Sequence, residues 1–112
     1  MKKKEAKRLV DFSVISRNLP SEEAVVSFYL AAQGYRLYDI VNALLEFRFC
    51  SLPVGGKNIL AHNVAEILNQ LAKEPINILM KNSAARRVEF TYSLTKRGKI
   101  FYKLLNMWVQ QA

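Results

Sequence analysis

The chain has 112 residues, of which 51% are apolar and 23% charged, a balance typical of a single folded domain and not of a disordered chain. Its longest near-continuous apolar run, Ala24–Ala32, is much shorter than the roughly 20 residues of a membrane-spanning helix, so no membrane span is expected and a membrane is not the expected partner. Cys50 is the only cysteine, which excludes an intramolecular disulfide and fits a reducing compartment.

The net charge of +8 is concentrated in two parts of the sequence. Residues 1–8 hold five basic residues and one acidic residue, residues 9–74 hold five basic and seven acidic, and residues 75–112 hold seven basic and one acidic. Clusters of this kind are typical of proteins in which particular elements contact a polyanion, and nucleic acid is the first candidate. A solvated basic surface that aids solubility and an anionic membrane surface are the alternatives.

The first third of the chain predicts an N-terminal arm and one helix. Residues 1–8 are expected to form a basic arm, mobile or continuing as the frayed start of a helix, ahead of a single domain over residues 9–112. The apolar pattern of residues 9–15 fits a short helix as well as a strand. Ser21 is a predicted helix N-cap, because two glutamates follow it in the first turn, where the helix dipole favours negative charge. Gly34 is the predicted end of this helix.

Two further helices are expected, with a loop between them. Apolar residues recur at i, i+3, i+4, i+7 and i+8 within residues 35–47, which predicts a helix. Residues 48–58 contain proline and two glycines and predict a loop, with a short extended piece at 47–52. The next helix is expected over about residues 59–73, with Asn58 as a possible cap.

The apolar pattern then changes to a period of two, which predicts a β-hairpin over about residues 76–94. Apolar residues are expected to alternate along both strands: Ile76, Ile78 and Met80 in the first, and Val88, Phe90, Tyr92 and Leu94 in the second. Thr95 is a predicted cap for a final helix over residues 95–112. The order helix, helix, helix, hairpin, helix predicts a mainly α fold with a β-hairpin, in the α+β class.

The helix expected over residues 59–73 has one polar face. On a helical wheel its apolar side chains fall on one side, where they must face a core: Leu60, Val64, Ile67, Leu68 and Leu71. The other side carries side chains that can hydrogen-bond to base edges or phosphates: His62, Asn63, Glu66, Asn69, Gln70 and Lys73. The hairpin adds basic side chains near its turn: Lys81, Arg86 and Arg87. Such a helix followed by a basic hairpin favours contact with duplex DNA, although any solvent-facing helix shows polar residues.

Residues 86–98 resemble the second wing strand and the following helix start of bacterial and archaeal winged-helix regulators of the MarR/HxlR/PadR type. Those proteins commonly carry an arginine, an aromatic residue and then Leu-Thr-x-x-Gly. The matching residues in this chain are Tyr92, Leu94, Thr95 and Gly98. The resemblance covers about residues 59–108 and implies a winged helix-turn-helix fold and a DNA-binding transcriptional regulator, usually a homodimer. The connection over residues 48–58 departs from it, since those families have a tight turn there.

The expected function is sequence-specific binding of duplex DNA by a transcriptional regulator, with residues 59–73 in the major groove and the hairpin on phosphates or in the minor groove. The predicted DNA-binding residues are Lys57, Asn58, His62, Asn63, Glu66, Asn69, Gln70, Lys73, Lys81, Arg86 and Arg87. Glu66 is the unfavourable member, because phosphates repel a carboxylate unless it meets a cytosine amine. Homodimerisation is predicted through an apolar stripe on the last helix: Phe101, Leu104, Leu105 and Trp108.

The sequence carries little that indicates catalysis or metal binding, so neither an enzyme nor a cofactor is expected. His62 is the only histidine and Cys50 the only cysteine, which leaves no cluster of metal ligands and no third group to orient a nucleophile–base pair. Two other functions stay open: a protein-interaction module of the same fold, acting as an adaptor or inhibitor, and a replication or transfer accessory protein of a phage or mobile element. The expected location is the cytoplasm, on the nucleoid when DNA is bound.

Overall fold

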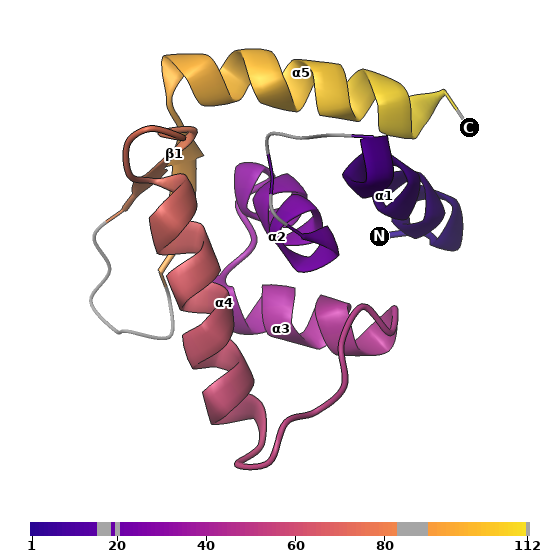
Figure 1. The fold of residues 1–112 in the computed structure, drawn as a ribbon, viewed down its shortest axis with the longest axis vertical. Coiled ribbons are helices and arrows are strands. Elements are labelled where there is room, and N and C mark those ends of the chain that lie inside the picture. Colours follow the sequence, from indigo (N-terminus) through magenta and orange to yellow (C-terminus); the bar gives the residue numbers. More distant parts are fainter. Residues whose placement is uncertain (16–18, 20, 83–89, 112) are drawn as a thin grey trace.

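The computed structural model describes residues 1–15, 19, 21–82 and 90–111. Over these residues the protein is mainly helical with one antiparallel pair of short strands, which agrees with the predicted α+β class. The elements in chain order are α1 (Lys3–Ile15), α2 (Glu22–Ala32), α3 (Leu37–Glu46), α4 (Lys57–Leu71), β1 (Leu79–Lys81), β2 (Tyr92–Leu94) and α5 (Lys96–Gln110). Figure 1 shows α2 at the centre, with α5 lying across one end and α1, α3 and α4 around the remaining sides.

α2 forms the centre of the core because its residues after the first turn are apolar on nearly every side, with Ser27 as the buried polar exception. All its residues from Ala24 to Ala31 are buried, and it contacts α1, α3, α4, α5 and β2. Ser21 is its N-cap, as predicted, and its hydroxyl oxygen accepts a hydrogen bond from the Ala24 amide at 3.2 Å. Gly34, at φ +88°, follows the last turn and its amide donates to the Ala31 carbonyl oxygen, which confirms the predicted end. In the described ranges, no helix combines the length and the apolarity needed to cross a bilayer.

The basic N-terminus is helical from Lys3, so of the two forms left open for residues 1–8 the structure shows the start of a helix. These residues form the first turns of α1, which packs against α2 and α5. Ala6 and Leu9 are buried on the inner side of α1, while the lysines at positions 3, 4 and 7 remain exposed. Residues 9–15, which the sequence left open between helix and strand, continue the same helix. Leu9 is buried and Phe12 packs against the core, whereas Val14 is 79% exposed, so the local apolar pattern alone could not decide between helix and strand.

The connection between α3 and α4 contains no strand, so the extended piece expected at 47–52 is wrong. α4 begins after Gly56, which is its N-cap at φ +80°. Asn58 therefore lies inside the first turn, and its predicted role as a cap is also wrong. As a result α4 starts and ends two residues earlier than the predicted range 59–73.

The two strands pair in the register Leu79 with Leu94, Met80 with Ser93 and Lys81 with Tyr92. The alternation predicted for the first strand is wrong, because Ile78 and Leu79 are both buried whereas Met80 is 53% exposed. The reason is that Ile78 precedes the strand and is held by other backbone groups. Its amide donates to the Leu71 carbonyl oxygen at 2.9 Å, and its carbonyl oxygen accepts from the Thr95 amide at 3.3 Å. The predicted turn and Val88 lie outside the described residues.

α5 closes the core from above and begins at its predicted cap. The Thr95 hydroxyl accepts from the Gly98 amide at 3.0 Å and donates to the Asn77 carbonyl oxygen at 2.7 Å, which ties the helix start to the segment before β1. Leu105 and Val109 are fully buried. Aromatic rings fill the space between α5, α1 and α2: the Phe101 centroid lies 5.3 Å from that of Phe28 and 6.0 Å from that of Phe12.

These contacts show that most of the apolar stripe predicted to form a dimer interface is covered within the chain itself. Leu105 is buried within the chain, and Phe101 and Trp108 are partly buried against its core. Of the four stripe residues only Leu104 is exposed, at 59%. The stripe is therefore largely covered within the chain, by α1 and α2. Homodimerisation itself stays a prediction.

A buried tyrosine connects the three helices at the top of the core. The Tyr29 hydroxyl of α2 donates to Glu5 Oε2 of α1 at 3.2 Å and lies 3.3 Å from Asn106 Oδ1 of α5. Its surroundings raise the pKa of Tyr29 above the ordinary value of 10.0, first through burial and then through the negative charge of Glu5. The folded protein therefore retains this proton at a pH at which the unfolded chain has released it.

Stability is expected to fall as the pH rises through about 10, in part because of Tyr29. Above the unfolded pKa the folded state binds more protons than the unfolded state, so the free energy of unfolding decreases with pH. Urea unfolding at several pH values between about 8 and 11 measures this, with Tyr29→Phe as the control because phenylalanine has no ionisable group. Wild type is expected to lose stability relative to Tyr29→Phe over this range. A pH-independent difference between the two proteins would contradict the assignment.

Candidate nucleic-acid interface

α4 lies at the outside of the molecule with one face against α2 and α3 (Figure 1). The residues buried on its inner face are Leu60, Ala61, Val64, Leu68 and Leu71. Four of them were predicted from the helical wheel, and the fifth predicted core residue, Ile67, is partly buried. The apolar face of α4 is thus confirmed, and this fixes which side chains point to solvent.

The outer face of α4 carries polar side chains that no other described element covers. The exposed members are His62, Asn63, Glu66 and Gln70, and Lys73 is exposed just beyond the helix end. His62 Nε2 lies 3.2 Å from Glu66 Oε1, and both side chains are more than 60% exposed. This contact places the carboxylate of Glu66 beside the imidazole ring of His62. The predicted solvent-facing position of all five residues is confirmed.

Asn58 and Asn69 are oriented differently from those five residues. The Asn69 amide oxygen accepts a hydrogen bond from the Tyr92 hydroxyl of β2 at 3.0 Å, and the Asn58 amide oxygen accepts from the Tyr38 hydroxyl of α3 at 2.7 Å. Burial raises the pKa of Tyr92, so its hydroxyl keeps the proton that it donates. Both asparagines therefore fix α4 to its neighbours. Helical-wheel positions alone do not reveal such partners.

A groove runs between α4 and the hairpin. Its volume is about 350 Å³, and aromatic rings on both sides and two alanines of α4 form much of its lining: Tyr38, Phe90, Tyr92, Ala61 and Ala65. Lys81 lies at this groove, with its Nζ 3.9 Å from the centroid of the Phe90 ring. This cation–π contact holds a positive charge next to the outer face of α4. The aromatic members were not predicted as site residues, and only their period-two and helical spacing marks them in the sequence.

Cations also lie near the start of α4. Lys57 Nζ donates to Asn42 Oδ1 of α3 at 3.1 Å and remains exposed. The N-cap Gly56 has no side chain to satisfy the first amides of α4, which leaves them able to bind an anion. Arg36, the exposed N-cap of α3, is a further cation that the sequence did not single out. The predicted wing arginines Arg86 and Arg87 lie outside the described residues.

Cys50 and His62 are on different flanks of α4, so they do not form a nucleophile–base pair. Cys50 lines a pocket with Asn63 and Ile67, whereas His62 lines the groove toward the hairpin. Burial, followed by the charge of Glu23, raises the pKa of the Cys50 thiol, which disfavours the reactive thiolate. Among the residues that the structure describes, no three His, Cys, Asp or Glu side chains are grouped to hold a metal ion.

Comparisons of this chain with protein-family models, with curated proteins and with solved structures find no match. The function of the α4 surface must therefore be inferred from its residues and their geometry. Three features carry that inference: an uncovered polar helix face, an adjacent hairpin that holds Lys81, and cations at both ends of the helix. Together they single out the outer face of α4 as the candidate interface.

Proposed function

We propose that this protein binds duplex DNA in a sequence-specific manner through α4 and acts as a transcriptional regulator. The observation that carries the proposal is the uncovered polar face of α4, which is followed in the chain by an antiparallel hairpin packed beside it. Three packed helices with the third on the outside, followed by a hairpin, are the arrangement expected of a winged helix-turn-helix protein. In that fold the third helix enters the major groove and the hairpin contacts the backbone.

The dimensions and polarity of α4 support this docking. Its 15 residues span about 22 Å, and an α-helix fits into the major groove of B-DNA. Asn63 and Gln70 lie on the exposed face, where their amide groups can pair with adenine. Lys57 and Lys73, at opposite ends of the helix, then lie toward the two phosphate strands. These positions divide the contacts into base recognition in the middle and backbone binding at the ends.

The neighbouring residues support this mode of binding in a second way. The hydrogen bonds of Tyr38 to Asn58 and of Tyr92 to Asn69 lock α4 against α3 and β2, so the reading face is held in one orientation before DNA arrives. Lys81 supplies a phosphate contact from the hairpin. We propose that Asn58 and Asn69 are positioning residues and that the paired His62 and Glu66 limit which base edge is accepted.

Asn63→Ala and Gln70→Ala are each expected to weaken binding to the preferred duplex by about 5- to 150-fold, the equivalent of about 1–3 kcal/mol for a lost base contact. Sequences bound from a random duplex pool identify that duplex, and fluorescence anisotropy measures the affinities. Gln110→Ala removes an exposed amide from α5 and is the matched control, with no change expected. Affinity for random duplex should stay the same in all three variants.

Two results would contradict the proposal. One is wild-type protein that shows no salt-dependent binding to any duplex, because phosphate contacts release counterions and make affinity fall with salt. The other is equal loss of specific and random binding in Asn63→Ala and Gln70→Ala, which would remove base recognition from α4. The selected sequence also tests assembly, since two copies related by symmetry select a palindrome with half-sites about one DNA turn apart.

A further inference from the structure

The outward side of α5 is both basic and apolar. Ile100, Leu104 and Met107 lie at i, i+4 and i+7, and their exposed fractions are 62%, 59% and 53%. They form one continuous strip, because residues at this spacing share a helix face. α5 also carries exposed cations and no acidic residue: Lys96, Arg97, Lys99 and Lys103. The strip and these cations together are called the basic-apolar face of α5 below.

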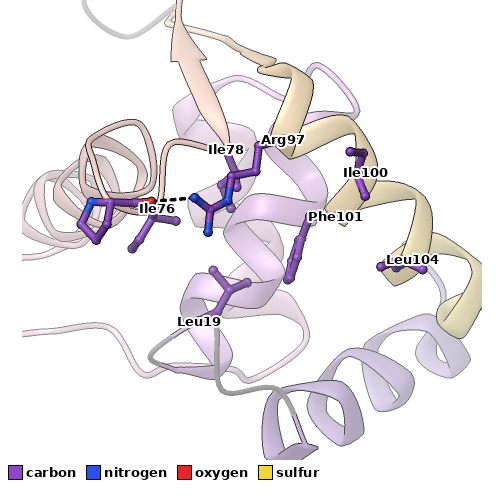
Figure 2. A pocket seen from close by; sticks show the side chains of 8 residues that line it. Leu19, Ile76, Ile78, Arg97, Ile100, Phe101 and Leu104 are labelled. Carbon is purple, nitrogen blue, oxygen red and sulfur yellow. Dashed lines mark hydrogen bonds between the residues drawn. The ribbon is translucent and has the colours of Figure 1, made fainter.

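A pocket opens beside this strip, between α5 and the segment that precedes β1 (Figure 2). Its apolar lining includes Leu19, Ile76, Ile78 and Phe101, with Ile100 and Leu104 of the strip at α5. The volume of about 320 Å³ is near the lower limit of ligand pockets, so it suits one large apolar side chain. The Arg97 guanidinium also lines the pocket and donates to the Pro75 carbonyl oxygen at 2.9 Å, which fixes a cation there.

We propose that the basic-apolar face of α5 binds an acidic amphipathic helix of another protein. Apolar anchors at i, i+4 and i+7 are the pattern used when a helix docks on an apolar surface, and the pocket supplies a concave site for one anchor of the partner. Carboxylates beside the partner's apolar stripe then meet Lys99, Lys103 and Arg97. Such opposite charges fix the register of the partner and speed its association.

Charge and apolar burial together favour an acidic amphipathic helix over a second copy of the chain, duplex DNA or an anionic membrane. A second copy docked through the same strip would bring Lys99 and Lys103 close to their own equivalents, and like charges across an interface are unfavourable. Duplex DNA would satisfy the cations but leave three exposed apolar side chains and an apolar pocket in water. An anionic membrane would match the strip, but a planar surface does not fill the pocket. An acidic amphipathic helix satisfies the strip, the pocket and the cations together.

This surface belongs to a different element from the proposed DNA-reading face of α4. α5 packs on α1 and α2, whereas α4 packs on α2 and α3. The two surfaces share no residue. A substitution in the strip should therefore leave duplex affinity unchanged, and the failure of one proposal does not affect the other.

The test uses a synthetic helical peptide that has leucines at i, i+4 and i+7 and glutamates at its other exposed positions. Isothermal titration with the full chain should show that this peptide binds at least tenfold more tightly than a peptide with lysines in place of the glutamates. Leu104→Asp is expected to weaken binding at least tenfold, as is the double variant Lys99→Glu/Lys103→Glu. Ile100→Asp is the second strip variant, and circular dichroism checks that each variant is folded.

The double variant Lys4→Glu/Lys7→Glu is the matched control, because it changes the same charge at exposed positions of α1. Its affinity for the acidic peptide should stay within about threefold of wild type, since neither lysine belongs to the basic-apolar face of α5 and exposed charges are screened by salt. Equal weakening by the two charge variants would overturn the proposal in favour of non-specific attraction. Two other results would also overturn it: a wild-type dimer that Leu104→Asp dissociates, and strip-dependent binding to vesicles of anionic lipid without binding to the peptide.

Discussion

Gly98→Ala is expected to lower the free energy of unfolding by about 3 kcal/mol or more, although alanine is a better helix former than glycine by about 1 kcal/mol. Gly98 lies in the first turns of α5, directly over the segment that precedes β1. A Cβ at this position would overlap the carbonyl oxygen of Ile78. One methyl group therefore forces α5 and the hairpin apart, because backbone in contact with backbone cannot rearrange as a side chain can.

The Ile78 carbonyl has little freedom to move away. It accepts a hydrogen bond from the Thr95 amide at 3.3 Å, and the amide of the same residue donates to Leu71 at 2.9 Å. The Thr95 side chain adds a bond to the Asn77 carbonyl oxygen at 2.7 Å. Relief of the overlap must break some of these bonds, so the cost includes both steric strain and unsatisfied backbone groups.

Lys99→Ala is the control for Gly98→Ala, because it places the same alanine one residue later at an exposed position. Chemical unfolding should show that this control changes stability by less than about 0.5 kcal/mol. If Gly98→Ala is as stable as wild type or more stable, α5 does not approach the backbone before β1 this closely.

Trp108→Ala is expected to lower the free energy of unfolding by about 3 kcal/mol, within the range for truncation of large aromatic side chains. The indole Nε1 donates to the Arg8 carbonyl oxygen at 3.0 Å, and the Arg8 side chain donates to the Trp108 carbonyl oxygen through Nε at 3.1 Å and Nη2 at 3.0 Å. The Arg8 guanidinium carbon also lies 3.8 Å from the centroid of the Trp108 ring. These contacts join α1 to the C-terminal end of α5, where a cation also complements the helix dipole.

A double-mutant cycle with Arg8→Ala tests whether the contacts between Arg8 and Trp108 stabilise the fold together. The decreases in unfolding free energy of Trp108→Ala and Arg8→Ala are expected to sum to more than the decrease of the double variant. The expected coupling energy is at least about 1 kcal/mol, because each residue holds the other in place. Sedimentation separates this role from a dimer interface. The stabilising role of the Arg8–Trp108 contacts is contradicted if Trp108→Ala keeps the unfolding free energy of wild type and converts a dimer into monomers.

Local sequence signals were sufficient where a residue acts on its own neighbours. Ser21 and Thr95 cap the helices that were predicted from them, and Gly34 ends α2, because each satisfies backbone groups within four residues. The apolar face of α4 was also predictable, since a helical repeat with one apolar side has one way to face a core. The polar face that supports the proposed DNA contact follows from the same repeat.

Contacts between distant residues could not be predicted in this way. The sequence by itself determined the order of the elements from α2 onward, the N-caps Ser21 and Thr95, and most of the exposed face of α4. Only the tertiary structure decided that residues 3–8 continue a helix, that Asn69 is bonded to Tyr92, and that Trp108 closes on Arg8. An apolar stripe specifies that it must be covered, but its periodicity is the same whether the cover is a helix of the same chain or of a second molecule. Here that cover comes from α2 and α1, the latter about one hundred residues away in the sequence, and periodicity contains no information about a contact at that distance.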